Sequence, residues 1–422
     1  MFFAQAFTQP SFVLFTNLLT GWVICPGRRT VTRMLHVGDS DGEHAHDAYH
    51  RFFRAGRWAM TPLWKTLTLT MVAALKLTGA IMIDLDDTLF HKTGRKVNGA
   101  SVYRDPVRSS RKKVVYAWGL NLVVLTLRVT PPWGGEPLGL PINLRLYRKG
   151  GPSHLELGEE MIREVADWLP DHHFKLSCDG AYASLLGWEL PRTTVTTRMR
   201  RDAAIYEPPP PRKKSQPVPR GRPRKKGPRL PTPEAIARRR KKGWVRTTVE
   251  ERGKKVKRLT LALQVMWYKV NKEQSVWLLI RRDPTGKQDD DFIVTNDPDA
   301  VPAKALGQYA GRWSIEDTNR NVKQFLGGEE PQVWKGPGPK RAAALSFWLS
   351  SVVWLWYLTT QGTKPVLPAL PWFPKKCHPS FADALAALRR VLWRQKVFCI
   401  SPKRAHLPKI IETLIEVLAT AA

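Results

Sequence analysis

The sequence predicts an α/β fold, with a mixed β-sheet flanked by helices, on the basis of three observations. Strand-like apolar runs occur in succession at residues 81–85, 114–129 and 142–147. Apolar residues then recur at helical spacing from Leu155 to Leu169, and a short fourth strand follows at residues 174–178. Three strands, a right-handed crossover helix and a fourth strand are typical of a sheet in which the first and fourth strands are neighbours.

The N-terminal 75 residues are expected to form a separate helical region. Apolar side chains stand at helical spacing at Phe12, Phe15, Leu18 and Leu19, and again at Leu63, Leu67, Met71 and Leu75. Residues 76–207 contain the strands and the crossover helix, and are therefore the first part of the core.

Residues 208–258 differ sharply from what precedes them. They contain twenty Lys or Arg against three Glu, together with ten prolines. Such a segment cannot bury a core, so we expect an extended or disordered insert that becomes ordered on an anion. The whole chain has a formal net charge of +32, far more than solubility requires, and a polyanion is the natural partner.

The second part of the core is expected at residues 259–362. Three more strands are predicted at residues 259–270, 275–283 and 291–297, followed by a helix over 301–326. The apolar run at residues 342–358 has seventeen residues, fewer than the roughly 20 that span a bilayer, so we predict a buried helix and no membrane association. Residues 363–422 are predicted to be a helical C-terminal region.

Cysteine and histidine patterns give no metal site of the zinc type. The four cysteines lie far apart without a CxxC pair, which fits reduced cytosolic thiols, and no positively charged segment precedes the apolar N-terminus as in a signal peptide. His44, His46 and His50, and the pair His172 and His173, have no convincing zinc-ligand set around them. We therefore expect surface or packing roles for these histidines.

Acidic residues follow two of the predicted strands. The first strand leads into Asp84, Asp86 and Asp87, and the fourth stops at Asp179. If the two strands are neighbours, their ends bring two carboxylates together, with Asp86 or Asp87 as the first, since strand parity alone does not decide between them.

A further acid lies within the most specific pattern in the chain. Tyr309, Arg312, Glu316 and Lys323 stand at helical offsets that place all four inside an arc of roughly 60°. A structural Arg312–Glu316 salt bridge alone would account for part of this pattern. If Glu316 joins the other two acids, however, the three carboxylates repel one another unless divalent cations lie between them.

Hard oxygen ligands suit Mg²⁺, or Mn²⁺, and two such ions would polarise the attacking oxygen and stabilise the leaving oxygen of a phosphodiester. The sequence therefore predicts metal-dependent phosphoryl transfer on nucleic acid, with no small-molecule cofactor.

These residues resemble the DDE transposases of bacterial insertion sequences, in the subgroup whose third acid lies in a Y-x2-R-x3-E-x6-K signature. Tyr309, Arg312, Glu316 and Lys323 match that signature at every position, while "LDDTLFHKTG" and "SCDGAYAS" resemble the family's first- and second-acid strands. The likeness covers about residues 80–360. It implies an RNase H-like fold with a β-rich insertion before the last catalytic helix.

The resemblance implies roles for single residues. Asp86, Asp179 and Glu316 would be ligands of two Mg²⁺ ions, with Asp86 favoured over Asp87 because the family's first acid is commonly followed by x-Thr. Tyr309, Arg312 and Lys323 would hold DNA phosphates near the cut, Lys92 would add another contact, and Tyr182 would contact a nucleotide or belong to the core.

The basic insert is expected to add contacts to DNA. "PRGRPRKKG" at residues 219–227 is similar to an AT-hook, which lies in a narrow A·T minor groove. The alternative is unspecific phosphate contact by Arg220, Arg222, Arg224, Lys225 and Lys226. The N-terminal helical region is expected to bind DNA as well.

The expected function is that of a DNA transposase that cleaves the ends of a mobile element and joins them to target DNA. The partners would be double-stranded DNA and a second copy of the chain, in the bacterial cytoplasm at the nucleoid. Two alternatives remain open, an RNase H-like endonuclease without strand transfer and a catalytically inactive DNA-binding protein derived from a transposase.

Overall fold

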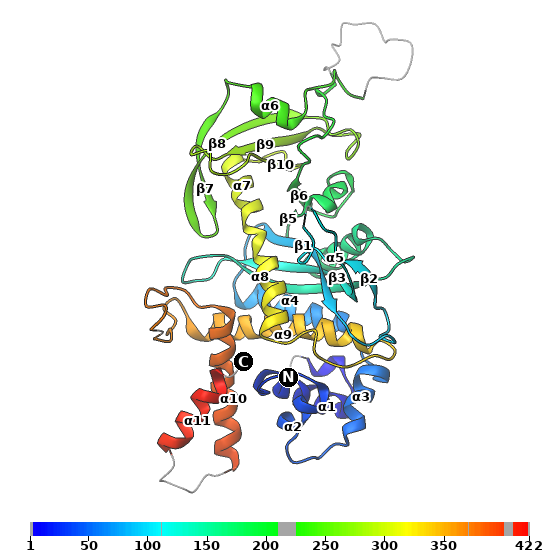
Figure 1. Cartoon of the computed structure of the whole chain (residues 1–422), viewed down its shortest axis with the longest axis vertical. Coiled ribbons are helices and arrows are strands. Elements are labelled where there is room, and N and C mark those ends of the chain that lie inside the picture. The colour runs from blue at the N-terminus through cyan, green and yellow to red at the C-terminus, as the bar shows by residue number, and fades with distance from the viewer. Residues whose placement is uncertain (1–2, 111, 210–224, 370, 401–407, 421–422) are drawn as a thin grey trace.

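A computed structural model describes residues 3–110, 112–209, 225–369, 371–400 and 408–420 (Figure 1). Within these residues ten strands form one mixed sheet in the order β2-β3-β1-β5-β6-β10-β9-β8-β7, with β4 paired to β3. The strands of its first half are β1 (Ile81–His91), β2 (Ser101–Arg104), β3 (Tyr116–Val129), β4 (Leu138–Tyr147), β5 (Phe174–Cys178) and β6 (Thr193–Arg198). The mixed sheet flanked by helices is thus confirmed.

The first half of the sheet has the predicted neighbours. β1 pairs antiparallel with β3 and parallel with β5, and β5 pairs parallel with β6. The parallel β1–β5 pair requires a crossover, which is supplied by α5 (His154–Trp168). α5 begins with a capping box, in which the Ser153 hydroxyl accepts a bond from the Glu156 amide and the Glu156 carboxylate accepts one from Ser153. Its buried apolar stripe packs on the sheet.

Helices cover this part of the sheet on both faces. α5 lies on the face of Leu85, whose side chain fills the space beside Gly158, and α8 (Trp313–Gln324) lies on the opposite face. α9 (Gly338–Gln361) crosses below α8 and packs on β4 and on the N-terminal helices (Figure 1). These are η1 (Ala4–Ala6), α1 (Gln9–Ile24), α2 (Val31–Gly38), α3 (His46–Ala55) and α4 (Met60–Ala74). The predicted N-terminal helical region is therefore present.

α9 is the one helix in the described part of the chain that is long and apolar enough to cross a membrane. Most of its apolar side chains are buried inside the protein, including Phe347, Trp348 and Trp354. The Trp348 indole donates to the Leu63 carbonyl, which ties α9 to α4. A core role explains its composition, as the sequence predicted.

The first strand is longer than predicted. We expected it to end at Leu85, but β1 continues to His91 because residues beyond Leu85 keep pairing with β3 as far as His91 opposite Gly119. The parallel pairing with β5 does stop at Leu85 opposite Cys178. The acids therefore lie inside a strand, at the point where its parallel neighbour leaves it.

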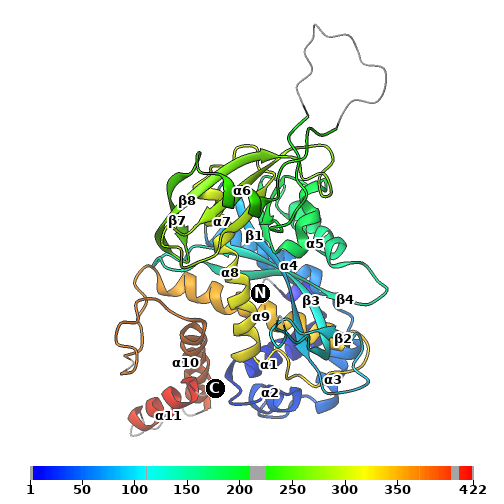
Figure 2. The same cartoon turned by 45° about the horizontal axis from the view of Figure 1, so that its top comes forward.

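The prediction for residues 208–258 was wrong over its second half. Residues 210–224 lie outside the described residues, but the chain then forms α6 (Pro233–Arg239), β7 (Val245–Glu251) and the start of β8 (Lys254–Val265). With β9 (Val276–Arg282) and β10 (Asp291–Thr295), β7 and β8 extend the central sheet (Figure 2). Val249 is fully buried against α7 (Pro302–Gly311), so this charged segment does contribute to a core.

The predicted helix over residues 301–326 is divided in two, because α7 ends at Gly311 and α8 begins at Trp313. Gly311 lies against the Arg128 guanidinium, where a Cβ atom would come within 2.7 Å of a nitrogen. This close approach favours glycine at the junction. The C-terminal helices α10 (Phe381–Ile400) and α11 (Pro408–Thr420) were predicted, whereas the short η2 (Gly180–Gly187), β2 and β6 were not.

Candidate active site

Asp84 is a buried structural acid rather than a solvent-facing one. It is fully inaccessible on β1, and the Arg128 guanidinium on β3 binds both of its carboxylate oxygens. The Ser314 hydroxyl on α8 donates to the same carboxylate, and Arg128 also donates to the Gln308 carbonyl on α7. This cluster fixes the α7–α8 junction on the sheet. Sequence analysis missed Arg128, although an arginine within an otherwise apolar strand was a usable signal.

Asp86 and Glu316 meet at one guanidinium. Arg312 Nη1 lies 3.4 Å from Asp86 Oδ2, and its Nη2 donates to Glu316 Oε1 at 2.7 Å. The Asp86 side chain is 18% exposed and that of Glu316 is 34% exposed, whereas Arg312 is buried beneath them. Residues 230 positions apart are thus brought together at the surface. The salt-bridge interpretation of Arg312 and Glu316 holds, but it includes Asp86.

The environment of the Asp86 carboxylate disfavours its charged form. Burial raises the pKa of Asp86 to about 7, and the charges of Asp87 and Glu316 add to the rise. Arg312 and the Asp87 amide oppose the rise without cancelling it. A further cation beside this carboxylate would stabilise its charged form.

Asp179 lies next to Asp86 on the neighbouring strand. The last registered pair of β1 and β5 is Leu85 with Cys178, and Asp86 and Asp179 are the next residues on each chain. Two residues earlier on each strand, Asp84 and Ser177 both face α7. The Ser177 hydroxyl donates to the Gln308 carbonyl on α7, and Asp84 pairs with Arg128, which donates to the same carbonyl. Alternation along a strand therefore turns Asp86 and Asp179 to that same face. Among the described residues, the Asp179 carboxylate has no hydrogen-bond or ion-pair partner.

Asp87 belongs to the opposite face of the sheet. Tyr182 donates to it at 3.3 Å and the Asn121 amide lies 3.4 Å away, so Asp87 points away from Glu316. Tyr182 is 1% exposed, and its phenol therefore packs in the core rather than against a nucleotide. The sequence left open whether Asp86 or Asp87 lies on the face of β1 that meets Glu316. In the structure Asp86 lies on that face.

The other signature residues spread along the two helices. The Tyr309 ring lies 5.7 Å from the Arg312 guanidinium, and burial raises the pKa of Tyr309 to about 12. Lys323 lies two turns beyond Glu316, with its ammonium 5.9 Å from the Phe90 ring. Burial lowers the pKa of Lys323, although Glu329 and Asp105 oppose this shift. The four side chains therefore form a row, with Lys323 apart from the carboxylates.

Lys92 is held by the protein itself. Its ammonium donates to the Glu329 carbonyl at 2.6 Å, and burial lowers its pKa to about 8.

The basic insert contains five residues predicted to contact DNA. Lys225 is exposed, whereas the Lys226 ammonium lies 3.8 Å from the centre of the Tyr206 ring and 4.6 Å from that of Tyr268. Arg220, Arg222 and Arg224 lie outside the described residues.

The donor set at Asp86, Asp179 and Glu316 fits a hard divalent cation. All three groups are carboxylates, the Asp179 carboxylate has no partner among the described residues, and burial raises the pKa of Asp86. Arg312 holds Asp86 and Glu316 on its two terminal nitrogens, so in this arrangement it supplies the positive charge between them.

A tighter acidic group is present elsewhere. In the described part of the chain, Asp39, Glu43 and His44 are the group whose ligand atoms all lie within 4.8 Å of one another. Asp39, however, accepts bonds from the amides of Glu43 and His44 and from the Tyr49 hydroxyl. These bonds close the loop between α2 and α3 and account for the group without an ion.

Comparison with known families assigns the chain. A search of curated proteins gives no match. The family described as DDE superfamily endonuclease matches residues 3–262, which include the N-terminal helices, Asp86 and Asp179 but not Glu316. The match begins before the resemblance over residues 80–360 that the sequence analysis described. It covers more than half of the 422 residues. The chain therefore belongs to the DDE superfamily endonucleases.

Proposed function

We propose that this endonuclease-family protein is a DNA transposase that cleaves the ends of a mobile element and transfers them to target DNA. The observation that carries the proposal is the approach of Asp86 and Glu316 to one guanidinium, with Asp179 at the adjacent strand position. The Tyr309, Arg312, Glu316 and Lys323 pattern adds support for the transposase subgroup. A homodimer on DNA would allow two ends to be joined together.

Asp86, Asp179 and Glu316 would hold two Mg²⁺ ions, or Mn²⁺. Bound there, the ions would polarise the attacking water or 3′-hydroxyl and stabilise the leaving oxygen. Arg312 would then no longer be needed to neutralise the two acids, and its planar guanidinium is suited to a bidentate phosphate contact. Asp84 and Arg128 would keep α8 in place on β1 while these contacts change.

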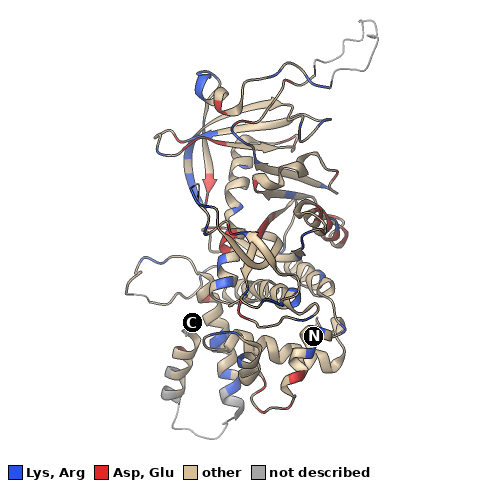
Figure 3. Cartoon of the chain, turned by 45° about the vertical axis from the view of Figure 1, so that its right-hand side comes forward, with Lys and Arg blue, Asp and Glu red and all other residues tan. Residues whose placement is uncertain are grey.

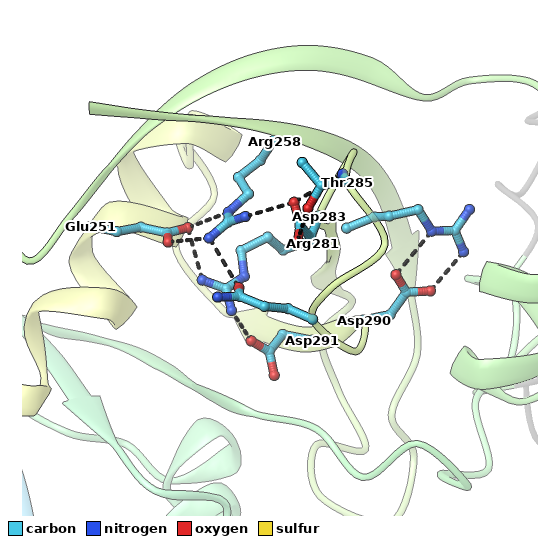
Figure 4. A network of polar contacts seen from close by, with 9 residues as sticks. Glu251, Arg258, Arg281, Asp283, Thr285, Asp290 and Asp291 are labelled. Carbon is cyan, nitrogen blue, oxygen red and sulfur yellow. Dashed lines mark hydrogen bonds and ion pairs between the residues drawn. The ribbon is translucent and has the colours of Figure 1, made fainter. Parts of the chain in front are cut away.

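The β7–β8 hairpin is the best candidate for a DNA-binding element in the second half of the sheet. On its inner face, Arg258 of β8 and Arg281 of the adjacent β9 are already neutralised by acids. Figure 4 shows Arg258 between Glu251 and Asp283, and Arg281 between Glu251 and Asp291. These arginines hold the hairpin to β9 and β10 and have little charge left for a ligand.

The outer face of the hairpin is different. Cross-strand pairing puts Arg246, Lys255 and Lys257 on the face opposite the buried Val249, and all three are exposed. Figure 3 shows lysine and arginine along this hairpin. At its tip the Arg252 guanidinium lies 4.6 Å from the Trp313 ring, beside Arg312. A two-stranded β-ribbon fits the major groove, so this face would lead DNA toward the carboxylates.

Neutralising this face tests its role. The triple variant Arg246→Gln, Lys255→Gln and Lys257→Gln is expected to weaken DNA binding and to reduce the slope of log K against log salt by about 2 to 3. The measurement is a fluorescence anisotropy titration at several salt concentrations. The charge-retaining triple Arg246→Lys, Lys255→Arg and Lys257→Arg should keep the parent slope. Equal slopes for the glutamine variant and the parent protein would contradict the assignment.

A joining assay separates the transposase from an endonuclease without strand transfer. Purified protein, Mg²⁺, a labelled DNA fragment ending in the gene's flanking sequence and a supercoiled plasmid are expected to give plasmid-linked label. Cleavage of the fragment without joined product would favour the endonuclease. Neither product, with DNA binding retained, would favour an inactive DNA-binding protein.

A further inference from the structure

A cavity of about 710 Å³ lies beyond the end of β1, away from the three carboxylates. Its walls are the segment after β1, residues 92–97, and the segment after α8, residues 329–334. The Asn98 amide donates to the Trp334 carbonyl at 2.9 Å, and the His91 amide donates to Glu329 at 2.7 Å. These bonds join the two walls, so the cavity is formed before any ligand enters.

Cations outnumber acids in the lining of this cavity. Arg28, Arg95 and Lys96 are exposed, and in the described part of the chain none of them has an ion-pair partner. Arg28 comes from the N-terminal helical region, whereas the other two follow β1. The half-buried Lys92 ammonium adds a fourth cation.

The two acids in the wall are already used. Glu329 accepts from the His91 amide and lies 3.1 Å from its ring nitrogen Nδ1. Glu330 accepts a bond from the Arg29 amide at 2.5 Å. The lining has four cations, Arg28, Lys92, Arg95 and Lys96, against these two carboxylates, which leaves a formal charge of +2 with His91 neutral, so the cavity attracts anions.

An aromatic ring completes the wall. Trp334 is 47% exposed, and the Lys335 ammonium lies 4.6 Å from its ring. An indole next to several cations can accept a nucleobase while the cations bind its phosphates, as in many sites for single-stranded nucleic acid. An apolar ligand would not need these cations, and a bare phosphate would not need the indole.

The cavity also lies within reach of the candidate active site. Lys323 and Glu316 are seven residues apart on α8, roughly 10 Å along the helix axis. The Lys323 ammonium lies near Phe90, and the lowering of its pKa by burial is opposed by the charge of Glu329, which lines the cavity. At about 3.4 Å per nucleotide of one strand, Lys323 lies about three nucleotides from Glu316, so a DNA strand at the carboxylates that passes Lys323 is directed toward the cavity.

We propose that this cavity is a nucleotide-binding subsite, in which Arg28, Arg95 and Lys96 bind phosphate and Trp334 stacks on a base. The nucleotide belongs to the DNA strand that runs from the carboxylates past Lys323, which rests on the proposed action on DNA. A free mononucleotide has the same chemistry, and the experiment below distinguishes the two sources.

The test is a scan with abasic DNA. Binding of a duplex with a single-stranded extension is measured by anisotropy in EDTA, with one abasic position moved along the strand. Trp334→Ala is expected to weaken binding of intact DNA about tenfold. At one position, the abasic substitution should weaken DNA binding by the parent protein by a similar factor. The same substitution should not weaken DNA binding by Trp334→Ala any further. Trp334→Phe should retain most of the affinity.

Matched variants separate this subsite from general DNA binding. Arg95→Gln with Lys96→Gln should weaken binding and lower the salt slope by about 2, whereas Lys269→Gln with Lys272→Gln, exposed outside the cavity, should not. Trp372→Ala, which removes an indole that is 81% exposed elsewhere, should keep the affinity of the parent protein and its response to the abasic position.

The outcomes distinguish the sources. Loss of the Trp334 effect at one abasic position supports a DNA strand. Thymidine monophosphate binding that depends on Arg95 and Trp334, without any such position, supports a free nucleotide instead. If neither is observed, the subsite is refuted. Since no cleavage is measured, failure of the catalytic proposal would leave this result unchanged.

Discussion

Replacing Glu316 with glutamine is expected to reduce metal-dependent DNA cleavage at least about 1000-fold, which corresponds to about 4 kcal/mol of transition-state stabilisation. Glutamine has nearly the same shape and keeps an oxygen that can accept the bond from Arg312, so the α7–α8 junction should remain intact. What is lost is the negative charge that would hold a metal ion. DNA binding, measured without metal, should change less than about threefold, or about 0.7 kcal/mol.

The neighbouring residue provides a matched control. Asp317 is on the same helix and pairs with Arg320 at the surface, so Asp317→Asn removes the same charge without touching the three carboxylates. Its cleavage rate should stay close to that of the parent protein. Asp179→Asn should match Glu316→Gln. Normal cleavage by Glu316→Gln would refute the metal-ligand assignment, and equal losses in Asp317→Asn would point to a general charge effect.

Replacing Arg128 with methionine is expected to give the largest loss of stability, about 3 to 5 kcal/mol, because it leaves Asp84 buried without its cation. The variant also loses the bond to the Gln308 carbonyl, which holds α7 at the sheet. Urea unfolding followed by circular dichroism measures the change. Since Asp84 and Ser314 link β1 to α8, cleavage should fall as well.

Two variants test the cause of that loss. Arg320→Met breaks an exposed pair with Asp317 and should cost at most about 1 kcal/mol. Adding Asp84→Asn to Arg128→Met removes the uncompensated charge and should recover part of the lost stability. A loss of under 1 kcal/mol in Arg128→Met would show that the buried pair does not hold this junction.

Local patterns predicted the elements whose apolar spacing is regular. β5 was predicted with its observed bounds, and α5 was recognised from its apolar stripe. The segment from Lys254 to Arg258 misled the sequence analysis because its charges suggested a solvated insert. In the fold, Arg258 is buried between Glu251 and Asp283, two partners that no local pattern could supply.

Local spacing also predicted part of the geometry of the candidate site, whose catalytic role stays a prediction. Helical spacing linked Arg312 with Glu316, but a straight helix was assumed where the chain is interrupted beside Arg128. The seven-residue spacing already places Lys323 two turns from Glu316, but the position of its ammonium near the Phe90 ring is a long-range contact that the spacing did not reveal.

The sequence alone determined the charge of the chain, its α/β class with a crossover helix between β1 and β5, and the acids that are candidates for chemistry, because these depend on residue type and short-range period. The tertiary structure showed that Asp86 rather than Asp87 faces Glu316, since that depends on which face of β1 meets α8. It also assigned Arg128 to Asp84, because contacts between residues distant in sequence are set by packing and have no local signal.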